Sequence, residues 1–309
     1  MHSRAVNESD IEAIFDLFGR AEHAAIGRQM TTRADVRDLL ASPGLDMASR
    51  TMVVESKDGR LSGFVALHPA PQAGQLRAHL LLASADGATD TARALLHLLD
   101  EWVLRDAPHA DTPVTMFQLP NCPAHDLMAA EGWSIVHSYT RLSIDLDTTE
   151  FPEPAQPPLG VRLRFAADDQ DRRAVHSVLE DALAGHWNHR RRTFAQFDRD
   201  QQQRDGYDAA LWWLAEVDGV CAGAVIARDP SERAWIAWLG VLDAYRGRGI
   251  GTQLLSTVFR LLRDRGHHSV GVDVDTHNSV GALGVYRTAG MSERGTADQW
   301  RKIYSQQPS

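Results

Sequence analysis

The sequence has few of the features that mark secreted, membrane-spanning or metal-stapled proteins. Its 309 residues contain only two cysteines, Cys122 and Cys221, and no Cys-x-x-Cys pair. This scarcity excludes a disulfide framework and a zinc ribbon. No run of about 18 apolar residues is present to cross a membrane, and the opening MHSRAVNESD lacks the apolar core of a signal peptide. We therefore expect a cytoplasmic protein with no membrane partner.

Basic residues are scarce in the first half of the chain. Residues 1–157 hold 12 Lys and Arg against 22 Asp and Glu, whereas residues 158–309 hold 20 against 19. An acidic half disfavours nucleic acid as a partner and would attract a cationic small molecule such as an amine. Acidity also keeps proteins in solution whatever they bind, so the count leaves both interpretations open.

The most informative stretch is residues 234–262, which reads as a strand, a glycine-rich loop and a helix. An apolar run ends at Val241, and residues 246–251 then read Arg-Gly-Arg-Gly-Ile-Gly. Apolar side chains follow at spacings of three and four, which places them on one buried stripe of an amphipathic helix. They are Leu254, Leu255, Val258, Leu261 and Leu262.

A loop of this composition is suited to binding an anion. The first amides of a helix lack intrahelical acceptors and lie at the positive end of its dipole. Glycines let a phosphate approach closely, and Arg246 and Arg248 can form forked hydrogen bonds to its oxygens. The spacing is neither that of a Walker loop nor Gly-x-Gly-x-x-Gly, which disfavours ATP and NAD. A tight turn with two solvated arginines is the alternative.

This loop and a second segment resemble the GCN5-related N-acetyltransferase (GNAT) family. Arg246-x-x-Gly249-x-Gly251 matches the family's pyrophosphate loop, Gln/Arg-x-x-Gly-x-Gly/Ala, and follows a strand that ends in Leu-Gly-Val. The second segment fits Asn-x-x-x-Ala-x-x-x-Tyr-x-x-x-Gly-Phe, with a methionine in place of the last aromatic. Its residues are Asn278, Ala282, Tyr286, Gly290 and Met291. The resemblance implies an N-acetyltransferase of the EC 2.3.1 class with acetyl-CoA as co-substrate.

The resemblance also assigns roles to individual residues. Tyr286 would protonate the leaving thiolate of CoA, for which a phenol with an ordinary pKa of about 10 is suited; a plain core aromatic is the alternative. The backbone at Leu239 and Val241 would hold the pantetheine arm and the carbonyl, and Asn278 would hold the arm further along. The loop residues expected at the cofactor are Arg246, Gly247, Arg248, Gly249, Gly251 and Thr252.

The acceptor side is less clearly marked. Residues 186–189, His-Trp-Asn-His, fall where the acceptor loops of the family lie, so Trp187, together with Trp238 on the strand, is expected to line the amine pocket. A packed tryptophan between two exposed histidines is the alternative. No metal is expected, because no third ligand accompanies the two histidines. The general base stays open among Glu180, Asp181 and Asp275.

The order of elements occurs twice along the chain, on either side of a Pro-rich, acidic segment. We therefore predict an N-terminal domain at 1–146, a linker at 147–158 and a C-terminal domain at 159–309. The predicted fold class is α/β (an α+β mixed sheet), with two tandem GNAT-like domains, each a mixed, mostly antiparallel sheet flanked by helices. The matched pairs lie 157 to 160 residues apart: Gly63 and Gly223, Asn121 and Asn278, Gly132 and Gly290.

The two copies differ where the chemistry is expected. A shift of 158 or 159 residues places Asp90 opposite Gly249 and Met128 opposite Tyr286, and it gives neither arginine a counterpart. We therefore expect a degenerate first domain. The predicted function is direct transfer of an acetyl group from acetyl-CoA to a primary amine of a small molecule, in the C-terminal domain. A non-catalytic acyl-CoA-binding sensor or interaction module is the alternative, and the oligomeric state is left open.

Overall fold

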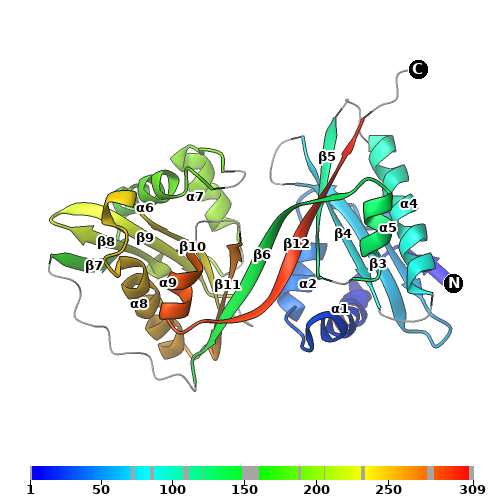
Figure 1. Ribbon diagram of the computed structural model, residues 1–309, viewed down its shortest axis with the longest axis horizontal. Helices are drawn as coiled ribbons and strands as arrows, with labels where there is room; N and C mark the ends of the chain where they lie inside the picture. The colour runs from blue at the N-terminus through cyan, green and yellow to red at the C-terminus, as the bar shows by residue number, and fades with distance from the viewer. Residues whose placement is uncertain are drawn as a thin grey trace. The chain divides into compact units, whose positions relative to one another are not determined.

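The computed structural model describes residues 2–305 apart from nine internal segments, and it divides into two compact units. The segments outside the description are 71–73, 84–86, 107–110, 121, 148–159, 187–188, 205, 231–233 and 277–281. The first unit comprises Met1–Tyr139 and Gly295–Ser309, and the second comprises Thr140–Arg294. Each is a mixed, mostly antiparallel sheet with helices on both faces, so the predicted fold class is confirmed (Figure 1).

In the first unit the strands lie in the order β1-β2-β3-β4-β5-β12. Side chains alternate between the two faces of the sheet, as the pleat of a strand requires. On β3, Val65 and Leu67 pack with α4, while Phe64 and Ala66 pack with α1 and α2. The strands are β1 (His2–Arg4), β2 (Thr51–Glu55), β3 (Leu61–Pro69), β4 (Leu76–Leu82), β5 (Thr112–Gln118) and β12 (Ser292–Tyr304), and the helices are η1 (Glu8–Asp10), α1 (Ile11–Ile26), α2 (Arg33–Leu40), α3 (Met47–Arg50), α4 (Ala88–Asp106) and α5 (His125–Ala130).

In the second unit the order is β6-β11-β10-β9-β8-β7. Helices α6 and α7 cover one face of this sheet, and α8 and α9 cover the other (Figure 1). The elements are β6 (Ser134–Asp145), β7 (Val161–Phe165), α6 (Asp169–Ala182), α7 (Phe194–Gln202), η2 (Ala209–Leu211), β8 (Trp212–Val217), β9 (Val220–Arg228), β10 (Ala234–Val241), η3 (Asp243–Tyr245), α8 (Ile250–Asp264), β11 (Ser269–Asp275) and α9 (Ala282–Thr288).

Strand β12 completes the first unit although it follows the second unit in the chain. It pairs antiparallel with β5 from Asp298 opposite Gln118 to Tyr304 opposite Thr112. Its Lys302 Nζ lies 3.0 Å from both carboxylate oxygens of Asp100 on α4. Conversely, the end of β6, which precedes the predicted linker, lies beside β11 in the second unit. The predicted boundaries at 146 and 159 separate two copies of a repeated order of elements. The compact units are instead defined by which segments pack together. The domain boundaries therefore stay a prediction.

The same close contact between a strand glycine and a helix occurs in both units. A Cβ on Gly63 would lie 2.9 Å from Leu95 Cδ1, and one on Gly223 would lie 3.3 Å from Leu254 Cδ1. Each leucine belongs to the long helix that packs on that glycine's sheet, α4 or α8. Only glycine lets helix and strand approach this closely. Among the described residues, no helix combines the length and the apolar character that crossing a bilayer requires.

Candidate active site

The parallel strands β10 and β11 pair over a short distance and then separate. Among the described residues they pair at Ala234 with Val270 and at Trp235 with Gly271, and a bulge against β9 follows on β10 before Trp238. Beyond that point the backbone groups of β10 that face β11 have no strand partner, and such groups need another hydrogen-bonding partner. The opening runs along Leu239 and Val241, where the sequence predicts the pantetheine arm.

The glycine loop delivers the start of α8 to the same end of β10. Gly247 and Gly249 have φ values of 75° and 74°, the left-handed region that glycine enters without strain. Gly249 is the N-cap of α8, and no side chain caps the helix. The first amides of α8 are therefore left to bind an anion at the positive end of the helix dipole. This is the geometry that the predicted pyrophosphate site requires.

Gly251 connects the three parts of the site. A Cβ there would lie 3.0 Å from Val285 Cγ1 on α9, 3.8 Å from Val241 Cγ2 and 3.9 Å from Leu239 Cδ2 on β10. Gly251 is buried and Thr252 half-buried in the first turn of α8. The start of the helix thus packs directly against the opening strand and against the residue before Tyr286.

The side chains of the two loop arginines donate hydrogen bonds to backbone carbonyls of the protein. Arg246 Nε donates to the Val241 carbonyl at 3.1 Å, and its Nη2 donates to the Ala182 carbonyl at 3.0 Å and lies 2.9 Å from Asp243. Arg248 Nη2 donates to a carbonyl within the loop at 3.3 Å. Arg246 therefore links the loop to the end of α6. Contact of either arginine with a pyrophosphate stays a prediction.

Tyr286 is buried between α9 and α8, with 8% of its surface exposed. Burial raises the pKa of its phenol well above the ordinary value, because the phenolate would lose its hydration. The group is thus held protonated, as a donor to a thiolate must be. Met291, 3% exposed, fills the core position that the family gives to an aromatic. Asn278 lies outside the described residues, so its predicted role stays a prediction.

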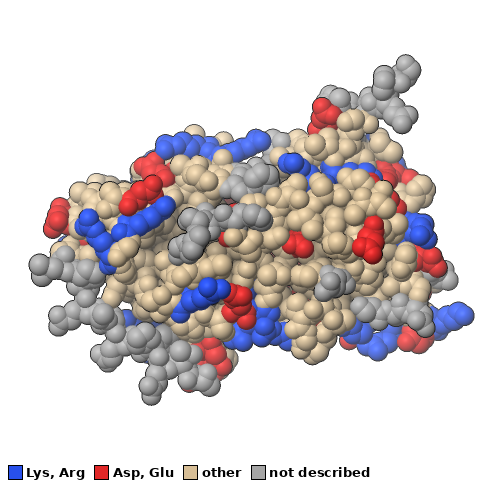
Figure 2. All heavy atoms as spheres, in the orientation of Figure 1, with Lys and Arg blue, Asp and Glu red and all other residues tan. Residues whose placement is uncertain are grey.

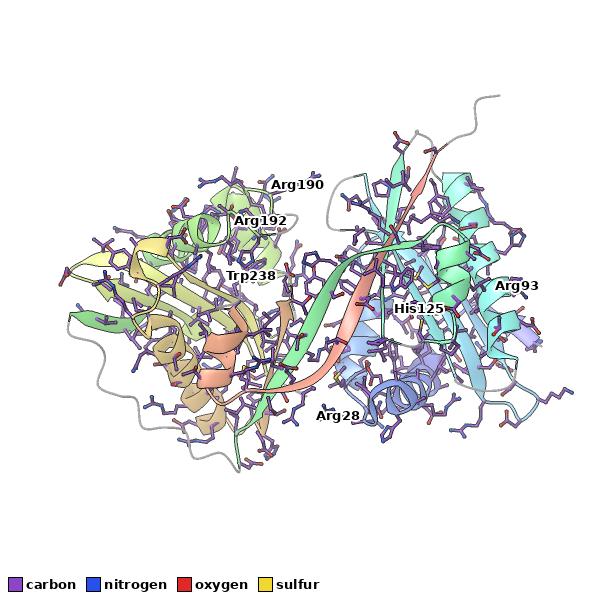
Figure 3. All side chains as sticks on the ribbon, viewed as in Figure 1. Arg28, Arg93, His125, Arg190, Arg192 and Trp238 are labelled. Carbon is purple, nitrogen blue, oxygen red and sulfur yellow. The ribbon has the colours of Figure 1, made fainter. Side chains whose placement is uncertain are left out.

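The opposite face of β10 carries Trp238 beneath helices α6 and α7. The guanidinium carbon of Arg192 lies 5.3 Å from the centre of the Trp238 ring and 5.0 Å from that of Phe197 (Figure 3). Behind Arg192 lies the carboxylate of Glu180, which is 4% exposed. This cluster was not predicted from the sequence. The signal that could have indicated it is Glu180, an acidic residue within the apolar stripe of α6. Trp187, the other predicted acceptor residue, lies outside the described residues.

The three candidate bases have different surroundings. Glu180 is enclosed by positive and polar groups, and Asp181 is half-exposed and paired with the exposed Arg191. Asp275 influences the pKa of His186. Burial lowers the pKa of this histidine, the charge of Asp275 opposes that shift, and the charge of Arg246 adds to it. Of the described His, Cys, Asp and Glu side chains, no three are grouped so as to hold a metal ion.

The corresponding region of the first unit is built differently. In the part of the chain that the structure describes, β4 and β5 also pair at two positions, but Gln118 Nε2 then donates to the Leu80 carbonyl at 2.9 Å across the gap. Helix α4 starts at Ala88, about one turn before the position opposite the start of α8. Asp90 therefore lies inside that extra turn, 75% exposed, and pairs with Arg93 at 3.2 Å. Met128, opposite Tyr286, is fully buried.

Comparison with known proteins agrees with this geometry. The model of the acetyltransferase (GNAT) family matches residues 172–291. The mycothiol acetyltransferase of Clavibacter sepedonicus is 31% identical over 232 residues, which cover 74% of this chain and 73% of that protein.

Solved structures show the same arrangement of elements. A GCN5-related N-acetyltransferase from Sphaerobacter thermophilus has a TM-score of 0.83 and 25% identity, and the match covers 99% of this chain and 96% of that chain. A tandem GNAT protein from the clavulanic acid biosynthesis pathway shares the fold, with a TM-score of 0.65 and 19% identity over 99% of both chains. The chain therefore belongs to the GNAT family of acetyltransferases, whose co-substrate is acetyl-CoA.

Proposed function

We propose that the second unit transfers the acetyl group of acetyl-CoA directly to a primary amine of a small molecule. The observation that carries the proposal is the packing at Gly251, which brings the uncapped start of α8, the open edge of β10 and the residue before Tyr286 within 4 Å of one position. This packing supports placing the anion site and the path of an extended arm next to α9, the helix that carries Tyr286.

The chemistry follows from these parts. The neutral amine nitrogen attacks the thioester carbonyl, forming a C–N bond and a tetrahedral oxyanion. The C–S bond then breaks, and the CoA sulfur takes the proton of the Tyr286 hydroxyl. The amine gives its extra proton to water or a carboxylate, and the phenolate regains a proton from solvent. Holding the thioester beside the amine supplies much of the rate enhancement in reactions of this kind.

The acceptor is proposed to be a small amine with cationic character. The name of the Clavibacter relative supports a small-molecule acceptor rather than a protein. The acid excess of residues 1–157 supports a cationic one. On the face shown in Figure 2, acidic and basic side chains are interspersed rather than gathered by sign. Any attraction is therefore expected to be moderate.

The experiment that tests this function follows free thiol released from acetyl-CoA in the presence of a panel of primary amines. Release that depends on both amine and enzyme, with the acetylated amine confirmed by mass, supports transfer. Binding of acetyl-CoA without amine-dependent release across the panel would favour the sensor interpretation. Gly249→Asp serves as the matched control, because it removes cofactor binding while leaving the acceptor face unchanged.

A further inference from the structure

Glu180 is a buried carboxylate on α6 that the proposed reaction does not use. With 4% of its surface exposed, it contacts four groups. Its Oε2 lies 3.2 Å from His189 Nε2 and accepts the backbone N–H of Arg192 at 3.3 Å. Its Oε1 lies 3.6 Å from Arg192 Nε and 3.8 Å from His176 Nε2.

These contacts attach one segment to α6 at two points. Two of the partners are the residues that bound the segment 189–192, and the third, His176, donates its Nε2–H to the Arg192 carbonyl at 2.9 Å. A buried carboxylate is tolerated only when its charge is paired and its oxygens are hydrogen-bonded. The Glu180 carboxylate therefore stabilises the segment in this position, because losing these partners would leave its buried charge unpaired.

The attachment reaches the acceptor face through Arg192. Its guanidinium lies over the rings of both Trp238 and Phe197. Within the described part of the chain it also pairs with Asp200, 3.8 Å away and 48% exposed. A guanidinium held over an indole by a cation–π contact restrains that ring. Trp238 stands directly after the bulge of β10 and directly before Leu239, where the strands separate.

We infer that Glu180 is a positioning residue: through Arg192 it fixes Trp238 on the acceptor side of β10, and it is not the general base. The inference rests on the proposed function, because it assigns Trp238 to the amine side of that site. This positioning role explains why α6 carries a buried carboxylate that the proposed reaction does not use.

A proteolysis experiment tests the attachment without any acceptor. Segment 189–192 contains Arg190, Arg191 and Arg192, all sites for trypsin, and the first two are exposed. In Glu180→Gln the loss of the carboxylate charge beside His189 and Arg192 is expected to raise the rate of cleavage in this segment by roughly tenfold or more, because removing one partner of a buried charge pair is costly. Asp200→Asn, which removes only the exposed partner of Arg192, is expected to change the rate less than about twofold.

Kinetics then test the positioning. For the best amine of the panel, Glu180→Gln is expected to lower kcat/KM by roughly 10- to 100-fold, the scale of a misplaced reactant, with the affinity for acetyl-CoA and the melting temperature little changed. Arg192→Lys keeps the charge and the tryptic site but loses the guanidinium that contacts both Trp238 and Glu180, so it should reproduce the kinetic loss.

The outcomes separate the claims. An unchanged cleavage rate in Glu180→Gln overturns the attachment, whether or not an acceptor is known. Faster cleavage with an unchanged kcat/KM, or a wild-type kcat/KM in Arg192→Lys, overturns the positioning role. If the wild-type protein acetylates no amine, the proposed function fails and the positioning role fails with it, while the proteolysis still decides whether Glu180 holds the segment.

Discussion

The side-chain amide of Gln118 donates a hydrogen bond to the carbonyl of Leu80 across the gap between β4 and β5. The parallel pairs match Gln118 to Val274. The antiparallel pairs, which include the bulge of β10, match Leu80 to Leu239. The valine side chain has no donor, so it cannot make the corresponding hydrogen bond. We predict that an amide of the pantetheine arm makes this contact in the second unit.

From this difference we predict one acetyl-CoA per chain in a calorimetric titration. Gly249→Asp should abolish binding, since a carboxylate would face the pyrophosphate and a non-glycine residue would occupy a left-handed conformation. Asp90→Ala should leave the affinity unchanged, because Asp90 lies in the extra turn of α4 and points to solvent. Two equivalent sites would show that the wrong unit has been assigned to the cofactor.

Tyr286→Phe should lower kcat by roughly 100-fold, the usual scale for a positioned proton donor, with the affinity for acetyl-CoA retained. Because burial raises the pKa of the phenol, the wild-type rate should show no loss from ionisation of Tyr286 as the pH rises towards about 10. A pH–rate profile and a calorimetric titration of both proteins measure this. A normal kcat in a reaction limited by chemistry would refute the role.

Arg246→Ala should weaken acetyl-CoA binding and also raise KM for the amine, because the side chain ties the glycine loop to the Ala182 carbonyl at the end of α6. We expect each effect to be about tenfold, which corresponds to about 1.4 kcal/mol. Arg248→Ala, whose contacts stay within the loop, should affect acetyl-CoA alone. Initial rates with each substrate varied in turn provide the comparison, and equal behaviour of the two variants would contradict it.

The rate with a cationic acceptor should fall as salt rises if the acidic first half attracts it. Screening shortens the range of such attraction to about 10 Å at 0.1 M ionic strength, so kcat/KM should decline steadily from low salt. A neutral acceptor of similar size serves as the control. Salt-independent kinetics with a carboxylated amine as the best acceptor would remove the electrostatic argument.

The first unit should lose stability in mild acid. Burial lowers the pKa of His79 to about 3, helped by the charges of His68 and Arg77, so His79 stays neutral in the folded protein. Below its ordinary value of 6.5 the unfolded chain takes up a proton that the folded chain does not, so stability falls as the pH drops from there. The slope is at most about 1.4 kcal/mol per pH unit for each such histidine.

Melting curves between pH 7 and pH 5 measure this slope. His79→Gln should flatten it, whereas His97→Gln, at a histidine that is 77% exposed on α4, should not. An equal slope in all three proteins would mean that another group governs the acid sensitivity.

The sequence allowed the family and the fold class to be predicted because their signals are local: glycines at fixed spacing, a stripe of leucines from Leu254 to Leu262, and an order of elements that occurs twice. The attachment of Arg192 to Glu180 could not be predicted, because three consecutive arginines look alike until the chain is folded. Nor could the pairing of β12 with β5, because alternation along Ser292–Tyr304 indicates a strand but not which neighbour it finds. The roles of the cofactor residues and of Tyr286 stay predictions.

The placement of β12 also affects how the protein can be made. During synthesis the strands of the first unit up to β5 emerge early, but the partner of β5 emerges only after the whole of β7–β11. Until then the edge of β5 carries unpaired backbone groups and Asp100 lacks Lys302. The first unit therefore stays incomplete during synthesis until β12 leaves the ribosome. Until then the edge of β5 can pair with strands other than β12. That interval, rather than the finished enzyme, is where this chain is most exposed to aggregation.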